Sequence, residues 1–298
     1  MLLTSSSVDK PKLGSLLLRR TISPKSTIAQ PPLRIAYRII RPTLLKSDHA
    51  PLLFIHGGPS LPSEYLNPIA DETPLQDRSL ILYDQLGCGW SSIPRENKWY
   101  CIENMALDLL ELLQHLKKQY DLASYHMCGH SLGGAIGYEV LRHTQDEEYK
   151  DNLPRCLSFI LSNASTNFDL SESERNRLLK ESRHTMNEFI AVHVCRTEKY
   201  PEALRLAIGR RGKEWSANNY VAVPLDRNTE QFPSVLIIRG KYDFVTEICT
   251  HGWKDLIGKP IQEIVLDGCS HYPHLEKPDD YSKVLQHFCV ASESGKLS

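Results

Sequence analysis

The chain has 298 residues, of which 41 % are hydrophobic and 24 % are charged, and its formal net charge is −1. This composition is typical of a globular protein whose core is large enough to need no metal or disulfide. The near-neutral charge gives no sign of a nucleic-acid partner, and no apolar run reaches the roughly 18 residues of a membrane span. We therefore expect neither nucleic acid nor a membrane among its partners.

The N-terminal part of the chain is basic. In residues 1–47, nine Lys and Arg stand against one acidic residue. We interpret residues 1–14 as a flexible tail and the remainder as a basic hairpin, because Ser15–Ile22 and Leu33–Ile40 both read as strands. A transit peptide for a mitochondrion or plastid is the alternative, since such peptides are also basic and poor in acidic residues.

The cysteines indicate the cellular compartment. The chain has eight, none of them in a CxxC pair, and a protein of this size does not depend on disulfide bridges. We therefore expect reduced thiols. Because the N-terminal part has no apolar stretch of secretory type, we predict a cytoplasmic location, with an organelle as the alternative.

Six further apolar runs have the length of strands. They are almost continuously apolar rather than alternating, which indicates strands buried on both faces of a parallel sheet. Helical stretches separate them, one over Glu103–Gln119 and others that begin at Leu132 and near Pro278. This alternation predicts a doubly wound, mostly parallel α/β sheet. The six runs are Pro51–Ile55, Ser79–Tyr83, Tyr125–Cys128, Cys156–Leu161, Val235–Ile238 and Ile261–Leu266.

The alternation of strands and helices breaks once. Residues 165–232 are polar and mostly helical, and we interpret them as a small helical cap inserted into the catalytic core. The core then comprises residues 15–164 and 233–298. Caps of this kind close over the carboxyl ends of the strands, where open α/β sheets bind ligands.

A nucleophile motif follows the third of these runs. Gly129-His130-Ser131-Leu132-Gly133 lies between a predicted strand and a predicted helix, which is the context that G-x-S-x-G requires in a serine hydrolase. The tight turn exposes the serine hydroxyl, the glycines relieve crowding, and the helix N-terminus faces the developing oxyanion. We predict Ser131 as the nucleophile. The alternative is a glycine-rich turn that contains a serine incidentally.

A second loop supplies a candidate oxyanion hole. The run Pro51–Ile55 leads into His56-Gly57-Gly58-Pro59, and glycines let the backbone approach a substrate carbonyl. Pro59 has no N–H, so we predict the backbone N–H groups of Gly58 and Leu132 as the donors. His56 could act as a base, but we expect it to brace this loop.

The acid and the base are predicted from chain order. A serine nucleophile needs a base, and the base needs an orienting acid; in this fold they follow the serine as acid and then histidine. Asp243 follows the strand Val235–Ile238, and His271 follows the strand Ile261–Leu266. We predict these two residues, with His274 as the competitor for the base.

With these motifs, the chain resembles the proline iminopeptidase branch of the α/β-hydrolase superfamily. The nucleophile motif, the turn at Asp243 and the loop at His271 are general to serine hydrolases. In contrast, H-G-G-P and Tyr83-Asp-Gln-Leu-Gly-Cys-Gly-Trp-Ser91 are closer to this branch. The resemblance implies an exopeptidase that releases N-terminal proline, and it implies that Asp84 supports the oxyanion loop. The chain departs from the pattern at Ser60, where the family has Gly, at Leu86, where it has Arg, and in its short cap.

The substrate is predicted less directly. An N-terminal proline is a cation near neutral pH, so an aminopeptidase needs a carboxylate in the pocket. Glu188 and Glu214 of the cap are our candidates for this role. The alternatives are an esterase, lipase or amidase that acts on a neutral small molecule, and a non-catalytic receptor or scaffold. Since no metal-ligand cluster or phosphate-binding loop is present, we expect no cofactor and no metal.

One helix of the cap is also predicted. Ser171 and Glu174 match a capping box, so we expect a long helix to begin there and to run to about Cys195. On such a helix Glu174, Glu181 and Glu188, spaced by seven residues, would share one face.

Overall fold

A computed structural model describes residues 10–19, 32–144, 149, 152–217, 219–225 and 232–296. Most of the predicted N-terminal tail and the end of the predicted strand Ser15–Ile22 lie outside these residues.

The core is one eight-stranded sheet with the order β1-β2-β4-β3-β5-β6-β7-β8. β1 and β2 pair antiparallel, as do β2 and β4, and all the other neighbours pair in parallel. The predicted mostly parallel α/β sheet is therefore confirmed. The strands are β1 Lys12–Leu17, β2 Arg34–Ile40, β3 Leu52–Ile55, β4 Leu80–Asp84, β5 Ser124–His130, β6 Arg155–Ser162, β7 Ser234–Gly240 and β8 Gln262–Leu266.

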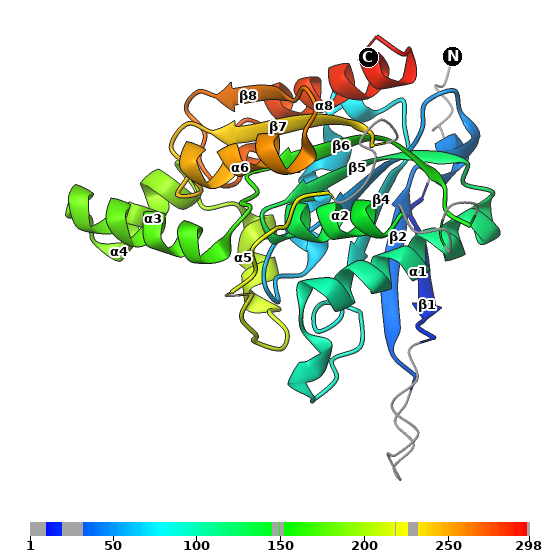
Figure 1. The fold of residues 1–298 in the computed structure, drawn as a ribbon, viewed down its shortest axis with the longest axis horizontal. Helices are drawn as coiled ribbons and strands as arrows, with labels where there is room; N and C mark the ends of the chain where they lie inside the picture. Colours follow the sequence, from blue (N-terminus) through cyan, green and yellow to red (C-terminus); the bar gives the residue numbers. More distant parts are fainter. Residues whose placement is uncertain are drawn as a thin grey trace, which may run out of the picture.

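Helices cover both faces of the sheet, and each face has its own apolar core (Figure 1). Side chains alternate along a strand, so Leu53 of β3 belongs to one core and Phe54 to the other. The first core also holds side chains of α1, α2 and α6, and the second holds side chains of α8. These helices are α1 Ile102–Tyr120, α2 Leu132–His143, α6 Glu247–Ile257 and α8 Pro278–Glu293. The short helix α7 is Pro273–Glu276, and the described residues also form 3₁₀ helices over Pro42–Lys46, Ser63–Asp71, Thr73–Leu75 and Asn97–Trp99.

The first strand begins earlier than predicted. β1 starts at Lys12, which pairs with Ile39, and it ends at Leu17, which pairs with Arg34. The predicted tail over residues 1–14 therefore runs too far. The reason is that β1 is an edge strand with several exposed side chains, so its ends are set by pairing with β2 and not by an apolar pattern in its own sequence.

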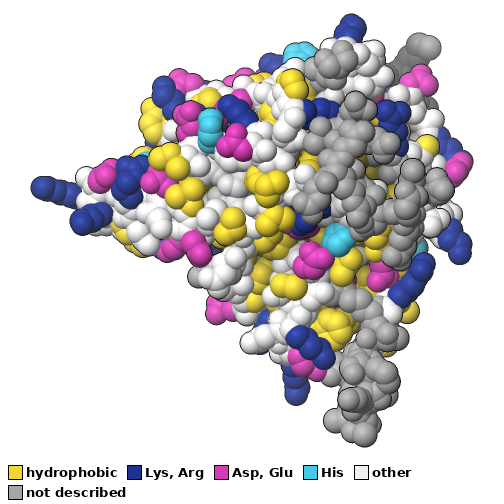
Figure 2. Space-filling model, viewed as in Figure 1, with side chains coloured by type: hydrophobic (Ala, Val, Ile, Leu, Met, Phe, Trp, Pro, Cys, Tyr) yellow, Lys and Arg dark blue, Asp and Glu magenta, His cyan; other side chains and the backbone are white. Residues whose placement is uncertain are grey.

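The chain leaves the sheet between β6 and β7. This stretch contains α3 Phe168–Ser182, α4 Met186–Phe189, the π-helical turn Ile190–Val194 and α5 Glu202–Gly209. Figure 1 shows α3 and α4 projecting beyond the sheet, on the side away from α1. In the same view, Figure 2 shows Lys and Arg side chains at the tip of this projection. None of the helices in the described part of the chain combines the length and apolar character of a membrane span.

The predicted single helix to Cys195 is wrong. The side chain of Asn167 caps α3 by accepting from the Leu170 N–H at 3.1 Å, so the helix starts before Ser171. The chain then breaks at Arg183, whose φ is 55°. The capping box lies at Thr185 and Glu188, where α4 begins.

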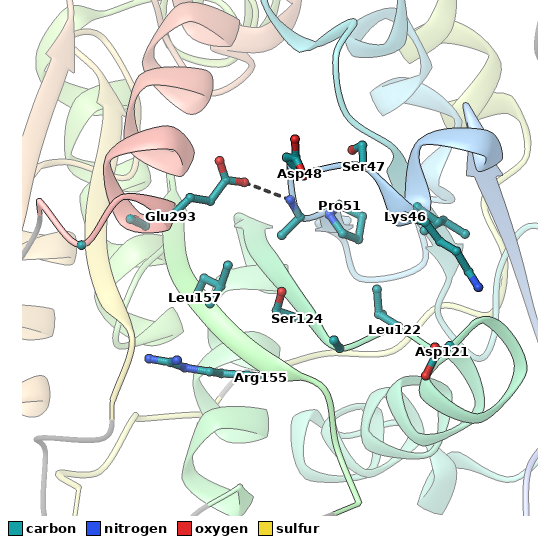
Figure 3. Close-up of a pocket in the computed structure, with 15 residues that line it drawn as sticks. Lys46, Ser47, Asp48, Pro51, Asp121, Leu122, Ser124, Arg155, Leu157 and Glu293 are labelled. Atoms are coloured by element: carbon teal, nitrogen blue, oxygen red, sulfur yellow. Dashed lines mark hydrogen bonds between the residues drawn. The ribbon is translucent and has the colours of Figure 1, made fainter.

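A partly buried ionic cluster holds the C-terminal helix to the amino ends of the strands. The Glu293 carboxylate accepts hydrogen bonds of 3.0 Å from the Arg78 guanidinium and from the Ala50 N–H, and it lies 3.0 Å from His126 and 2.9 Å from His49. Figure 3 shows Glu293 and its hydrogen bond to the backbone just before β3, at the edge of a cavity of about 570 Å³. The cluster lies at the end of the sheet opposite Ser131.

Candidate active site

The nucleophile motif forms the predicted strand–turn–helix junction. β5 ends at His130 and α2 begins at Leu132, so Ser131 occupies the turn with φ 53° and ψ −121°. Its N–H donates to the Ser162 carbonyl at 2.8 Å. A side chain on Gly129 would overlap the backbone of Gly133, so the turn can be this tight only with glycine. A non-glycine residue with positive φ is strained, and here the strain points the hydroxyl away from the sheet.

Ser131, His271 and Asp243 form one hydrogen-bonded chain. His271 Nε2 lies 3.1 Å from Ser131 Oγ, and His271 Nδ1 lies 2.9 Å and 3.1 Å from the two Asp243 oxygens. Because an ionised carboxylate only accepts hydrogen bonds, Nδ1 carries the proton and Nε2 is free to accept the serine proton. Asp243 and His271 are 3 % and 4 % exposed, so this chain is shielded from water.

A residue that the sequence did not reveal holds the acid. Asn163 Nδ2 donates to Asp243 at 2.6 Å and to the Ser270 carbonyl at 3.0 Å, and the Val245 N–H donates to the other Asp243 oxygen at 2.9 Å. Asn163 directly follows β6 and has φ 53°. A polar residue at the carboxyl end of a central strand was the only signal for this role.

His274 lies apart from the serine. It is fully buried, neither ring nitrogen has a hydrogen-bond partner among the described residues, and its ring packs against Tyr65, Tyr272 and Tyr281. Burial and the neighbouring His271 lower the pKa of His274 to about 3. The structure therefore brings His271, and not His274, to Ser131.

The loop after β3 is held from two sides. His56 Nε2 accepts from the Gln85 N–H at 2.9 Å, so Nδ1 carries the proton and donates to the Gly57 carbonyl at 2.7 Å. Burial lowers the pKa of His56, which keeps the ring neutral. Asp84 accepts from the N–H of Ser63 at 2.9 Å and of Trp90 at 2.9 Å, just beyond the loop. His56 thus bonds to the loop itself, and Asp84 bonds to the segment that follows it.

A second chain of hydrogen bonds links three loops of the site. The Gly57 N–H donates to the Tyr65 hydroxyl at 2.6 Å, and this hydroxyl lies 2.8 Å from His130 Nδ1. His130 Nε2 lies 2.7 Å from the His271 carbonyl oxygen, which can only accept. Nε2 therefore carries the ring proton, and the Tyr65 hydroxyl donates to Nδ1. Since Tyr65 engages the Gly57 N–H, the Gly58 N–H stays the predicted donor on this loop, beside that of Leu132.

A pocket of about 660 Å³ opens above Ser131. Gly57, Gly58, Pro59, Leu61 and Phe244 line it from the core, together with His271 and Tyr272. From the cap come four apolar residues and two arginines, which are Met186, Phe189, Ile190, Val194, Arg175 and Arg211. No Asp or Glu is among the described residues that line this pocket.

The predicted amine-binding carboxylates lie elsewhere. Glu188 is exposed and closes the capping box, where it accepts from the N–H and the hydroxyl of Thr185 at 2.8 Å each. Glu214 is also exposed, and neither residue lines the pocket. The break at Arg183 also removes the shared helix face that we expected for Glu188. Our assignment of these two glutamates to the pocket was wrong, and for Glu188 the reason is that it assumed one continuous helix.

The comparisons with known proteins decide the family. The profile of the alpha/beta hydrolase family matches residues 52–284. The chain belongs to this family. The hydrolase is 26 % identical over 282 residues to the proline iminopeptidase of Lactobacillus delbrueckii subsp. bulgaricus. The match covers 83 % of the hydrolase and 92 % of that relative.

Solved structures share the fold of this hydrolase. The crystal structure of the proline iminopeptidase of Mycobacterium smegmatis matches with a TM-score of 0.70 at 20 % identity and covers 89 % of this chain and 97 % of that one. The crystal structure of VinJ matches with a TM-score of 0.70 at 21 % identity, over 90 % and 99 % of the two chains. The predicted resemblance to the proline iminopeptidase-like branch is confirmed.

Proposed function

We propose that this hydrolase is a serine hydrolase that cleaves the ester or amide bond of a small substrate which carries no free amine at the acyl end. Ser131 is the nucleophile, His271 is the general base and Asp243 orients the histidine. The support is the continuous chain of hydrogen bonds from the Ser131 hydroxyl to the Asp243 carboxylate, beneath a pocket that accepts a small molecule.

The reaction follows from these contacts. Ser131 Oγ attacks the substrate carbonyl carbon while its proton moves to His271 Nε2, and the carbonyl oxygen gains a negative charge. The N–H groups of Gly58 and Leu132 stabilise that charge. The intermediate then expels the alcohol or amine, which takes the proton from Nε2. A water molecule, activated by the same histidine, releases the acid and restores Ser131.

The lining of the pocket carries our choice of substrate. An N-terminal prolyl group brings an ammonium ion, and burying an ammonium without a carboxylate costs several kcal/mol. The described lining offers two guanidinium groups and no carboxylate, so a cationic substrate meets repulsion there. An ester or amide without that charge avoids both the cost of burying an unpaired ammonium and the repulsion by the guanidinium groups.

Release of N-terminal proline is the second candidate. The observation that favours it is the similarity to proline iminopeptidases over more than four fifths of the chain. The identity is 25 to 26 %, and the described lining of the pocket holds no carboxylate for a prolyl ammonium.

One assay separates the two candidates. Purified protein is given a prolyl arylamide, the N-acetylated form of the same arylamide, and short-chain aryl esters. We expect the esters to be hydrolysed with the highest kcat/KM, and acetylation not to abolish cleavage of the amide. A strong preference for the free prolyl amine, lost on acetylation, would establish the aminopeptidase instead. Ser131→Ala serves as the control for contaminating hydrolases.

A further inference from the structure

Arg211 at the rim of the pocket has no acidic partner among the described residues. Its side chain lines the pocket above Ser131. Three other arginines of the cap do have acidic partners. Arg177 pairs with Glu174 at 2.8 Å, and Arg205 and Arg210 pair with Glu202 and Glu64. An arginine left unpaired beside a candidate nucleophile is placed to meet a charge that arrives with the substrate.

The backbone around Arg211 is tied to the core. The Gly212 N–H donates to the Ser60 carbonyl at 3.0 Å, and the Lys213 N–H donates to the Gly87 carbonyl at 2.8 Å. The Ser60 hydroxyl donates in turn to the Lys213 carbonyl. A side chain on Gly212 would overlap the Gly87 carbonyl oxygen, so the two segments lie in direct contact. The backbone that carries Arg211 is therefore held beside the oxyanion loop.

This anchoring gives Ser60 a function. Ser60 stands where the iminopeptidase pattern has glycine, and its side chain makes one of the bonds that hold the Arg211 segment. The serine that departs from the family pattern thus helps to hold the segment that carries the unpaired arginine.

Arg175 contributes a second positive charge to the same pocket. It comes from α3, and its one acidic partner among the described residues is Glu172, at 3.1 Å on the surface, where both side chains are more than a third exposed. Exposed pairs of this kind are weak, so a substrate anion can compete for the guanidinium.

We propose that Arg211, assisted by Arg175, binds a carboxylate of the substrate, and that the substrates are esters or amides with one free carboxylate on the cap side of the scissile bond. This inference rests on the proposed function and narrows its substrate class. The apolar side chains of Met186, Phe189, Ile190 and Val194 would then contact the part of the substrate between the carboxylate and the carbonyl.

The test compares matched anionic and neutral esters. A monoaryl adipate carries the carboxylate on the acyl side, and its methyl-capped diester is the neutral match. 4-Acetoxybenzoate carries the carboxylate on the leaving group, and its methyl ester is the neutral match. We expect one of the two anionic esters to exceed its neutral match in kcat/KM by about tenfold or more, mostly through KM. This preference should fall as the salt concentration rises.

The variants assign the preference to its residue. Arg211→Gln should reduce the anionic-to-neutral ratio of kcat/KM by about tenfold or more, and Arg175→Gln should reduce it less. Arg205→Gln, an exposed arginine of the same cap, is the matched control and should leave the ratio unchanged. The proposal is overturned if neither anionic ester is preferred, or if Arg211→Gln and Arg205→Gln behave alike.

A binding measurement keeps the proposal separate from catalysis. Titration calorimetry of adipate into Ser131→Ala should detect binding that is lost in the double variant with Arg211→Gln. Equal binding by both proteins, or by neither, contradicts the carboxylate site. If instead no ester or amide is hydrolysed and a fluorophosphonate labels no serine, it is the proposed function that fails, whatever the binding result.

Discussion

Tyr65 is the residue that joins the oxyanion loop to the rest of the site. Its hydroxyl accepts from the Gly57 N–H and donates to His130, which directly precedes Ser131 and also bonds the backbone of His271. Burial and the neighbouring histidines lower the pKa of His130 well below its usual value, so this ring stays neutral and its two bonds keep their directions. Tyr65 is a positioning residue, since it touches no reacting atom.

Tyr65→Phe removes the hydroxyl that bonds to Gly57 and His130 and keeps the aromatic ring. The buried Gly57 N–H then loses its acceptor, which costs about 1–3 kcal/mol, and the loop that carries Gly58 is less well held. We expect kcat on an aryl ester to fall about tenfold with little change in KM, because the loop acts on the transition state. Tyr100→Phe, which removes a buried hydroxyl bonded to Pro94, is the control. An equal loss in both variants would contradict a role specific to this loop.

Alanine substitutions of His271 and His274 should have clearly different effects on kcat. His271→Ala should lower kcat by about 10³-fold or more, since Ser131 then keeps its proton. His274 is a buried neutral ring that packs between tyrosines, so His274→Ala should lower thermal stability and leave most of the kcat of the folded enzyme. Steady-state kinetics and thermal unfolding of both variants check this. The reverse ranking in kcat would make His274 the base.

Residues with a local signature were predictable from the sequence, and residues defined by distant contacts were not. Ser131, Asp243 and His271 each follow a strand at a recognisable turn, and the structure brings the three together. Asn163 and Arg211 have ordinary neighbours in the sequence. Their surroundings come from chain segments dozens of residues away, which no periodicity or spacing encodes.

At the scale of elements, the cap is where sequence patterns failed. Ser171 and Glu174 have the spacing of a capping box, yet both lie inside α3, where Ser171 bonds back to Asn167 and Glu174 bonds to Arg177 and Thr246. The spacing alone is satisfied at many places in a polar helical stretch. In contrast, the strands of the core were predicted to within a few residues, because burial on both faces demands continuous apolar runs.

The capping box of α4 orders one wall of the pocket. Thr185 starts this helix, and Met186 and Phe189 then face the pocket. Thr185→Ala removes the N-cap hydrogen bond of α4. N-cap bonds of this kind stabilise a helix by about 1 kcal/mol, so the first turn of α4 should fray. We expect KM for aryl esters to rise while kcat changes little, and amide exchange at residues 186–190 to become faster. Unchanged amide exchange at these residues would contradict the role of the Thr185 capping box.

At the scale of the whole molecule, Glu293 makes stability depend on pH. Burial alone would raise the pKa of this carboxyl, but hydrogen bonds from His126, His49 and Arg78 outweigh it and lower the pKa to about 2. A carboxyl with a depressed pKa stabilises the fold above its unfolded pKa of about 4.5. That stabilisation is lost as the pH falls from about 4.5 through 2.

Glu293→Gln tests this cluster. At pH 7 we expect the free energy of unfolding to fall by about 2 kcal/mol or more, because Arg78 is fully buried and loses its charged partner. Between pH 4.5 and 2 the variant should lose stability less steeply than the natural protein. Ester hydrolysis below the unfolding temperature should be unaffected, since the cluster lies at the opposite end of the sheet. Parallel stability curves for the two proteins would refute the assignment.

The central claim is that Ser131 is an activated nucleophile, and site-resolved labelling with a fluorophosphonate tests it most directly. The account predicts that the reagent modifies the peptide containing Ser131, that labelling and ester hydrolysis are lost together in Ser131→Ala, and that His271→Ala labels far more slowly. Labelling of a different residue, or ester hydrolysis that survives in Ser131→Ala, would contradict it.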